Sequence, residues 1–344
     1  MNSIPKVSII LPGWNEAENI GSCINSIQKQ NYDSFNVYMI LGGDDTAYVE
    51  KARDLKWDRL IVLNQIEPNK MKAYNSVMNQ PGLGDILIFS DMDCEFPRDF
   101  IACYVDAFKD KNKNIITGRV RPNPSSKGFI DRYHRRFEEK IAPDKQKIIH
   151  AVVGANFAMR KSFFFHKVRQ FDESVTVGTD HVIAQRFKEI GEPIHFDPRL
   201  VVDTQMFSAG IPKYIEQQSR WIRIRVLRNR RTNHKAFRQG IMSLLYAWLM
   251  VFIFPLGILL SKFYGIWPVW RILLLIWIAL LGMAWKTRFK ILRFRKDENE
   301  DNVSLVKDVA CALCLLPVHY GIRVLSSLQL IFGKDKVEKR LPSF

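Results

Sequence analysis

Short apolar runs alternate with segments of helical composition along the first part of the chain. Runs rich in β-branched and aromatic residues predict strands at Val7–Leu11, Asn36–Leu41, Arg59–Leu63, Asp85–Ser90 and Asn114–Val120. Helices are predicted between them, at Glu16–Lys29, Thr46–Lys56 and Asn69–Asn79. Alternating strands and helices are typical of a mainly parallel sheet with helices on its faces, so we predict an α/β fold.

The same pattern continues less regularly as far as residue 205. A charged helix is predicted at Phe129–Ile141, and an apolar segment follows at Ala151–Met159. Another helix is predicted at Asp180–Gly191, and a short strand at Ile194–Phe196. We therefore predict one α/β domain over residues 1–205.

After residue 240 the chain becomes overwhelmingly apolar. Ile241–Leu260 contains no charged residue, and as a helix it is long enough to cross about 30 Å of hydrocarbon. Phe263–Trp285 can cross too, with Arg271 as its only charge, and the short turn between the two segments predicts a membrane hairpin. Tryptophan and tyrosine residues near the ends of these segments match the aromatic belts of membrane interfaces.

A third apolar segment, Val303–Phe332, is interrupted by Pro317, His319 and Arg323 and followed by basic residues. A full crossing would place those basic residues outside the cell, whereas Lys and Arg tend to stay on the cytoplasmic side. A kinked interfacial or re-entrant segment avoids this conflict, so we predict it in preference to a third crossing.

Positive charge is concentrated beside the apolar segments. The formal net charge is +16, and eight Lys or Arg residues lie from Arg220 to Arg238, just before the first apolar span. Such charge suits nucleic acid, an anionic membrane or a phosphorylated substrate. No nucleic-acid-binding motif accompanies it, so we predict membrane lipids as the partner and no nucleic acid. The predicted regions are an amphipathic basic interface helix at 206–240, a membrane region at 241–332 and a basic tail at 333–344.

The N-terminus and the cysteines indicate a cellular location. Met1–Lys6 leads directly into a predicted strand, so no signal peptide is predicted. The five cysteines do not form a disulfide framework, which fits a reducing compartment. Cys311 and Cys314 have metal-ligand or redox spacing, but their apolar context favours packing of small residues in a membrane helix. We predict a multi-pass protein of the cell membrane whose α/β domain is cytoplasmic.

Polar groups follow three of the predicted strands. They are Pro12–Glu16, Gly42–Asp45 and Asp91-Met92-Asp93. Ligands of such sheets collect outside the carboxyl ends of the strands, so we expect these groups to line one crevice. Asp91 and Asp93 can face one hard divalent cation, which in turn can hold a diphosphate. The alternative is a pair of turn-forming aspartates after a strand.

Two later motifs also have a chemical and a structural interpretation. Asp180 stands where a helix begins, and an aspartate there is often only an N-cap. Gln217, Arg220 and Trp221 share one face of a helix and can bind a diphosphate and a sugar ring. Alternatively, they anchor an amphipathic helix at the membrane interface.

One further group of residues has a possible role in phosphate binding. Lys70 and Lys72, beside Asn75, can contact phosphate, although a solvated helix face is the simpler interpretation. The chain contains neither a dinucleotide-binding Gly-x-Gly-x-x-Gly motif nor a Walker-type loop.

In this order, the motifs resemble those of the family 2 glycosyltransferases. The similar branch is the membrane-attached one, with cellulose, chitin and hyaluronan synthases and ceramide glucosyltransferase, and the likeness covers about residues 5–225. The matching segments are Pro12-x-x-Asn15-Glu16, Lys70-x-x-Ala73-Tyr74-Asn75, Asp91-x-Asp93, Gly154-Ala155-Asn156 with Arg160, Thr179-Asp180 with Arg186, and Gln217-x-x-Arg220-Trp221.

The chain departs from the family pattern at two points. The family often has Asp-Asp-Gly-Ser after its second strand, whereas this chain has Gly42-Gly43-Asp44-Asp45-Thr46, so either Asp44 or Asp45 can make the nucleobase contact. The acidic residue that usually precedes the base is Thr179 here, which leaves Asp180 in place.

The resemblance implies a glycosyltransferase A-type fold and inverting, single-displacement transfer from a nucleotide-sugar, with UDP as the expected nucleotide. It implies that Asp91 and Asp93 hold Mg²⁺ or Mn²⁺ and that Asp180 is the base. The implied donor-binding residues are Pro12, Glu16, Asp44, Asp45, Lys70, Asp91 and Arg220. The implied acceptor-binding residues are Gln217 and Trp221.

The number of membrane segments bears on the acceptor. Two or three are too few to line a polysaccharide channel, so we expect a lipid or lipid-linked glycan acceptor at the cytoplasmic membrane face. One alternative is a subunit of a processive polysaccharide synthase. Another is a membrane-anchored binding or scaffold protein built on a degenerate transferase domain, against which the intact Asp91, Asp93 and Asp180 argue.

Overall fold

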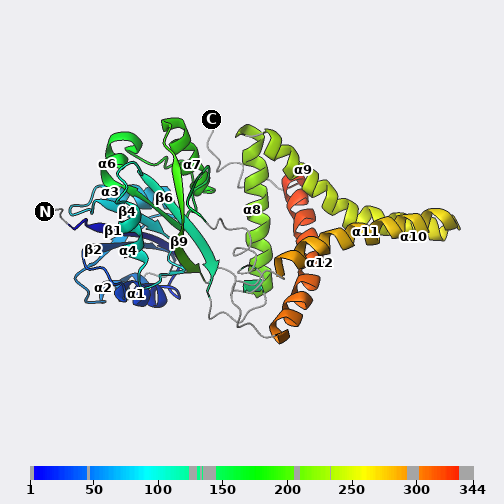
Figure 1. The fold of residues 1–344 in the computed structure, drawn as a ribbon, viewed down its shortest axis with the longest axis horizontal. Coiled ribbons are helices and arrows are strands. Elements are labelled where there is room, and N and C mark those ends of the chain that lie inside the picture. The colour runs from blue at the N-terminus through cyan, green and yellow to red at the C-terminus, as the bar shows by residue number, and fades with distance from the viewer. Residues whose placement is uncertain are drawn as a thin grey trace. The chain divides into compact units, whose positions relative to one another are not determined.

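The computed structural model describes most of the chain, in two compact units that divide after Met206 (Figure 1). The second unit also takes in Ser126–Ile141. The described residues are 4–44, 47–123, 130–131, 134, 145–204, 210–232, 234–292 and 302–332.

The first unit is built on a mixed sheet of nine described strands. These are β1 (Val7–Trp14), β2 (Phe35–Gly42), β3 (Leu60–Asn64), β4 (Ile86–Ser90), β5 (Cys94–Glu95), β6 (Ile115–Pro122), β7 (Lys147–Ile149), β8 (Asn156–Arg160) and β9 (Ile194–Thr204). The order is β3-β2-β1-β4-β8-β6-β9-β5, and β7 pairs with β9. The sheet is parallel through β3, β2, β1 and β4, and β8 runs antiparallel between β4 and β6.

Helices of the first unit cover both faces of this sheet. They are α1 (Ile20–Gln28), α2 (Ala47–Arg53), α3 (Lys70–Met78), α4 (Phe100–Ala107), α6 (Lys161–Phe163), which continues as a π-helical turn to Val168, and α7 (Thr179–Ile190). All five strands predicted for the first 120 residues are present, with small shifts at their ends. The charged helix predicted at 129–141 falls mostly outside the described residues.

Side chains of the central strands alternate between two hydrophobic cores, as the two-residue period of a strand requires. Ile9 and Ile88 face the core that contains α1 and α4, whereas Ile10 and Phe89 face the core that contains α3 and α7. Each fully buried side chain of this kind contributes about 1.5–3 kcal/mol. Helices α3 and α7 therefore lie on the same face of the sheet (Figure 1).

Strand β9 is longer than the sequence predicts. The pattern Asp197-Pro198-Arg199 resembles a turn after Phe196, but the strand continues to Thr204. The Asp197 carboxylate accepts hydrogen bonds from the backbone and the guanidinium of Arg199, and the register against β6 shifts at this point. The irregularity is thus absorbed within the strand, which carries Thr204 alongside β5.

The second unit is helical. Its elements are α8 (Gly210–Thr232), α9 (His234–Trp248), which continues through a π-helical turn to Ile253, α10 (Phe254–Phe263), α11 (Trp267–Leu292) and α12 (Asn302–Phe332). Two helical stretches, Phe237–Phe263 and Trp267–Ala284, are long and apolar enough to cross a membrane. The turn between them contains Gly265, whose φ of 69° favours glycine. These two stretches agree with the predicted hairpin.

The third apolar segment forms one α-helix with Pro317 inside it. Its polar residues make contacts within the helical unit: Arg323 donates to Ser243 of α9, and Ser326 donates to Ser219 of α8. Two of the interruptions seen in the sequence thus contact other helices, Arg323 as above and His319 through a hydrogen bond with the Tyr214 hydroxyl of α8. Whether α12 crosses a membrane or lies at its surface stays a prediction.

Candidate active site

The acidic pair lies where β4 ends in the middle of the sheet. Asp93 is joined to β9 by the Thr204 hydroxyl, which donates to its Oδ2 at 3.2 Å. Burial raises the pKa of the Asp93 carboxyl from 3.8 to about 7, and the Asp91 and Glu16 carboxylates add to this shift. Three carboxylates thus gather with too little positive charge to keep all of them ionised, which is the electrostatic setting that a divalent cation would relieve.

Lys70 supplies positive charge on the other side of the pair. It is the first residue of α3, and its Nζ forms an ion pair with Asp91 Oδ1 and lies 3.4 Å from the carbonyl oxygen of Gly154. Burial alone would lower the pKa of the Lys70 ammonium, but the Asp91 carboxylate raises it above its ordinary value. Lys70 therefore stays charged. Its ammonium group can balance the negative charge of a phosphate in addition to that of Asp91.

Asp180 approaches the same place from α7. The N-cap of α7 is Gly178, with a φ of 67°, and Asp180 lies one residue inside the helix, so Asp180 is not the cap. A Cβ atom added to Gly154 would lie 3.0 Å from Asp180 Cβ and 3.9 Å from Lys70 Nζ. Lys70 and Asp180 therefore both lie close to Gly154, and only the backbone of this glycine fits beside them. Asp180 and the Lys70–Asp91 ion pair thus lie on either side of Gly154.

The turn after β1 is bonded to the end of β2. The Asn15 amide donates to Asp44 Oδ2 at 3.1 Å and accepts from the Asp44 backbone at 2.8 Å. A Cβ at Gly43 would lie 2.0 Å from Asn15 Oδ1, so only glycine fits there. Asp44 is exposed at the carboxyl end of the parallel strands, where the sequence predicts a donor contact. Asp45 lies outside the described residues.

Pro12 and Glu16, also predicted as donor-binding residues, differ in position. Pro12 lies within β1, half-buried and paired with Ile40 of β2. Glu16 is half-buried after the strand, and its charge acts on Asp93. Glu16 thus belongs to the acidic centre, whereas Pro12 shapes the end of the strand.

Several residues of the matching motifs are structural instead. Asn156 is fully buried: it accepts from the Tyr104 hydroxyl and donates to the carbonyl oxygens of Arg119 and Leu200. Arg160 donates to three backbone carbonyl groups near the end of α4, and Lys72 pairs with Glu67. Asn75 is buried against the segment before α7, where its amide donates to the carbonyl oxygen of Phe171.

Gln217, Arg220 and Trp221 lie on α8, in the helical unit. Arg220 and Trp221 are exposed within that unit, whereas Ser219, which directly precedes Arg220, is buried and donates to Gln329 of α12 at 2.8 Å. Both interpretations of this motif, as a ligand contact and as an interface anchor, stay predictions.

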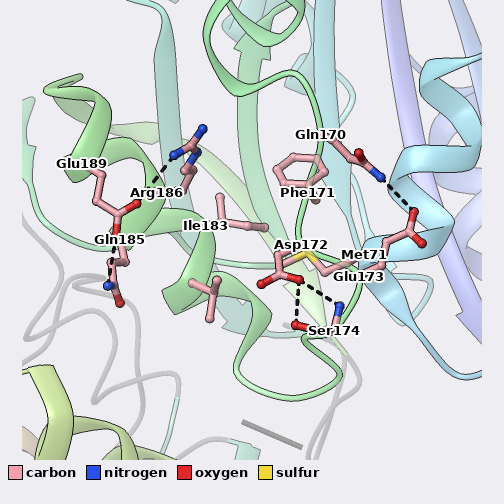
Figure 2. Close-up of a pocket in the computed structure, with 11 residues that line it drawn as sticks. Met71, Gln170, Phe171, Asp172, Glu173, Ser174, Ile183, Gln185, Arg186 and Glu189 are labelled. Atoms are coloured by element: carbon pink, nitrogen blue, oxygen red, sulfur yellow. Dashed lines mark hydrogen bonds and ion pairs between the residues drawn. The ribbon is translucent and has the colours of Figure 1, made fainter. Parts of the chain in front are cut away.

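A cavity of about 490 Å³ lies between α7 and the segment that precedes it (Figure 2). Glu189 and Gln185 of α7 line one wall, and Gln170 and Glu173 line the other. Phe171, Met71 and Ile183 supply apolar surface. None of Asp91, Asp93 and Asp180 lines this cavity, and nothing in the sequence pattern indicated it.

Metal binding would rest on few protein ligands. Among the residues that the structure describes, no group of three or more His, Cys, Asp or Glu side chains is arranged to hold an ion. Asp91 and Asp93 offer hard oxygen ligands of the kind that Mg²⁺ and Mn²⁺ prefer, and such ions commonly complete their shell with phosphate and water.

Known proteins resemble both the sequence and the fold. Residues 8–165 match the profile of glycosyl transferase family 2. Glycosyltransferase AglE of Haloferax volcanii is 28% identical over 123 residues, which cover 35% of this chain and 40% of AglE. Probable glycosyltransferase YdaM of Bacillus subtilis is 23% identical over 283 residues, which cover 76% of this chain and 66% of YdaM. The chain thus matches less than two thirds of either relative.

The fold is shared with a solved structure, the mannosyltransferase PcManGT from Pyrobaculum calidifontis in complex with GDP-Man and Mn²⁺. The TM-score is 0.53 at 16% identity, and the match covers 97% of this chain and 89% of that one. The predicted glycosyltransferase A-type α/β fold is confirmed, and its strands β1 to β8 lie, apart from Val7, within the residues that match the family 2 profile.

Proposed function

We propose that the chain is a metal-dependent, inverting glycosyltransferase. It moves a sugar from a nucleotide-sugar to an acceptor hydroxyl, and a UDP-sugar is the first donor to test. One observation carries this proposal: Asp91, Lys70 and Asp180 meet around Gly154 at the carboxyl end of the central strand. The reaction needs a pair of acids, a positively charged side chain and a separate carboxylate in one crevice. Asp91 with Asp93, Lys70 and Asp180 would supply them.

On the donor side, Asp91 and Asp93 would hold Mg²⁺ or Mn²⁺. The bound ion would neutralise the charge that develops on the diphosphate as it leaves. Lys70 lies beside Asp91 and would balance the remaining charge, while Asp44 at the ends of β1 and β2 would contact the nucleoside. The family motif alone assigns Arg220 to the diphosphate, and Gln217 and Trp221 to the acceptor.

On the acceptor side, Asp180 would accept the proton of the attacking hydroxyl. The acceptor oxygen forms a bond to the anomeric carbon as the bond from that carbon to the diphosphate oxygen breaks, so the configuration inverts and the nucleoside diphosphate leaves. A general base of this kind contributes about 10²–10⁴-fold to the rate. Asp180 is exposed at the first turn of α7, where a substrate can reach it.

We also propose a lipid or lipid-linked acceptor at the cytoplasmic face of a membrane. Two helical stretches have the length and composition of membrane spans, and the basic residues from Arg220 to Arg238 directly precede or enter the first. Positively charged residues beside a span favour the cytoplasmic side and anionic lipids. On this basis we propose that the chain is similar to the membrane-attached branch of family 2.

Two measurements on the full-length protein test this function. Thermal-shift screening of nucleotide-sugars with Mn²⁺ should find a donor that raises the melting temperature only in the presence of the ion. The labelled donor should then yield one added sugar on a lipid that organic solvent extracts. A ladder of polymer sizes would instead indicate a processive synthase, and no donor binding at all would contradict the proposal.

A further inference from the structure

Two buried asparagines join α3 to the segment that leads into α7. Asn69 Nδ2 donates to the carbonyl oxygen of Glu173 at 2.7 Å. Asn75 Nδ2 donates to the carbonyl oxygen of Phe171 and to Glu173 Oε1, both at 2.9 Å, and Asn75 Oδ1 accepts from the Phe171 backbone at 3.0 Å. Asn69 is 4% exposed and Asn75 is 9% exposed. We call this set of bonds the asparagine clamp.

The asparagine clamp connects the two halves of the candidate active site. Asn69 caps α3, and Lys70, the next residue, pairs with Asp91 on the donor side. The clamped residues Phe171 and Glu173 precede α7, which carries Asp180 in its first turn. The distance from Lys70 to Asp180 therefore depends on how α3 holds residues 171–173.

The segment is packed on one side and open on the other. The Phe171 ring is buried against Tyr74, Phe89 and Phe164. The cavity of about 490 Å³ lies along residues Gln170–Ser174, so this face of the segment lacks packed neighbours over that volume (Figure 2). Within the segment, Asp172 accepts two hydrogen bonds from Ser174, and these bonds shape the loop but do not attach it to another element. The bonds from Asn69 and Asn75 therefore fix the backbone of the segment to α3, in addition to the packing of the Phe171 ring.

We propose that Asn75, assisted by Asn69, is a positioning residue that sets the place of Asp180 relative to the donor site. The inference rests on the proposed function. A general base must lie within hydrogen-bond reach of the proton it accepts, and a misplacement of about 1 Å can cost about 10²-fold in rate. Asn75 does this without touching donor or acceptor, since its side-chain bonds are made to Phe171 and Glu173.

The main test is Asn75→Ala in the full-length protein. We expect kcat for sugar transfer to fall about 10–100-fold, while KM for the donor and the stabilisation by donor with Mn²⁺ stay within about twofold. Glu189→Gln is the matched control, because Glu189 lines the same cavity but makes no bond to α3. A kcat within twofold of wild type would overturn the proposal.

A double-mutant cycle separates positioning from a purely structural role. If Asn75 acts through Asp180, adding Asn75→Ala to Asp180→Asn should lower turnover no further, because the base is already absent. An equal fold-loss in both backgrounds would show that Asn75 only supports folding. Hydrogen exchange of residues 171–180 without substrate provides an independent readout, and unchanged exchange in Asn75→Ala would contradict the clamp even if no donor is ever found.

A milder variant serves if Asn75→Ala does not fold. Asn69→Ser keeps a side chain that can cap α3 but removes the donor to Glu173. We expect the same pattern on a smaller scale, about 2–10-fold in kcat at constant donor KM. A rise in donor KM without a change in kcat would place Asn69 on the donor side alone and overturn its assigned role.

Discussion

At the scale of single residues, the candidate site combines groups that the sequence identifies with groups that it hides. Asp91, Asp93 and Asp180 stand out because each follows or opens a recognisable element. The partners of Asn75 do not, since Phe171 and Glu173 lie almost a hundred residues away in the sequence. A local pattern cannot show that an asparagine is buried against a distant backbone.

Asp93 gives the first prediction, which concerns stability and pH in metal-free buffer. Its pKa is about 7 in the folded protein against 3.8 ordinarily, so between these values the unfolded chain releases a proton that the folded chain keeps. Asp93 therefore weakens folding increasingly as the pH rises through this window. At pH 8, the unfolding free energy of Asp93→Asn should exceed that of wild type by about 1–3 kcal/mol, and at pH 4.5 this difference should be smaller.

Denaturant unfolding at the two pH values measures this difference. Adding Mn²⁺ should narrow the stability difference between Asp93→Asn and wild type at pH 8. The ion stabilises only the wild type, since it binds the ionised carboxylate. An equal difference between the two proteins at both pH values would show that Asp93 is not a buried, charge-crowded carboxyl group.

Gly154 gives a second prediction at the same scale. A methyl group in Gly154→Ala would meet Asp180 Cβ at 3.0 Å, so the base must shift by a few tenths of an ångström or more. We expect turnover to fall about tenfold with little change in donor binding. Gly21→Ala on α1 is the matched control, because an added Cβ meets nothing within 4 Å there. Equal activity of the two variants would contradict the close approach of Gly154 and Asp180.

At the scale of elements, the hydrophobic pattern predicts the parallel strands because their burial on both faces makes them continuous apolar runs. It misses β5 and β7, which are only two and three residues long and owe their strand geometry to pairing with β9. It also shortens β9 at Pro198, since a proline inside a strand resembles an end.

Asn156 joins three elements and gives a third prediction. Its amide is bonded to Tyr104 of α4, to the Arg119 carbonyl of β6 and to the Leu200 carbonyl of β9, and Asn156, Tyr104 and Leu200 are fully buried. Asn156→Ala should lower the free energy of unfolding by about 2–4 kcal/mol, because it leaves buried partners unsatisfied. Chemical denaturation measures this loss. A drop in kcat of the folded fraction without a loss of stability would instead make Asn156 part of the reaction.

At the scale of the whole molecule, the sequence indicates both the α/β domain and the apolar helices, because each has a long and regular pattern. Large apolar side chains remain exposed on the two candidate spans, among them Leu259 (63% exposed) and Leu275 (66% exposed). An exposed apolar surface of this size is normally shielded from water by a partner or a membrane, and we propose that lipid shields it here.

The fourth prediction concerns membrane insertion. Leu275→Arg should impair insertion by about 2.5–3.5 kcal/mol, the cost of a charge near the centre of a span, because Leu275 lies in the middle of Trp267–Ala284. Extraction of cell membranes with alkaline carbonate should retain the wild type and release part of the variant. A wild-type protein that is released by carbonate and stays monomeric without detergent would contradict a membrane-spanning hairpin.

The central claim is that the acid pair and Asp180 serve one reaction, and initial rates of sugar transfer test it most directly. The full-length wild type, Asp93→Asn and Asp180→Asn are compared with one labelled nucleotide-sugar and Mn²⁺. The account predicts that Asp93→Asn loses both Mn²⁺-dependent donor binding and transfer, whereas Asp180→Asn binds the donor normally and transfers at least about 10²-fold more slowly. Transfer by Asp180→Asn at the wild-type rate would contradict it.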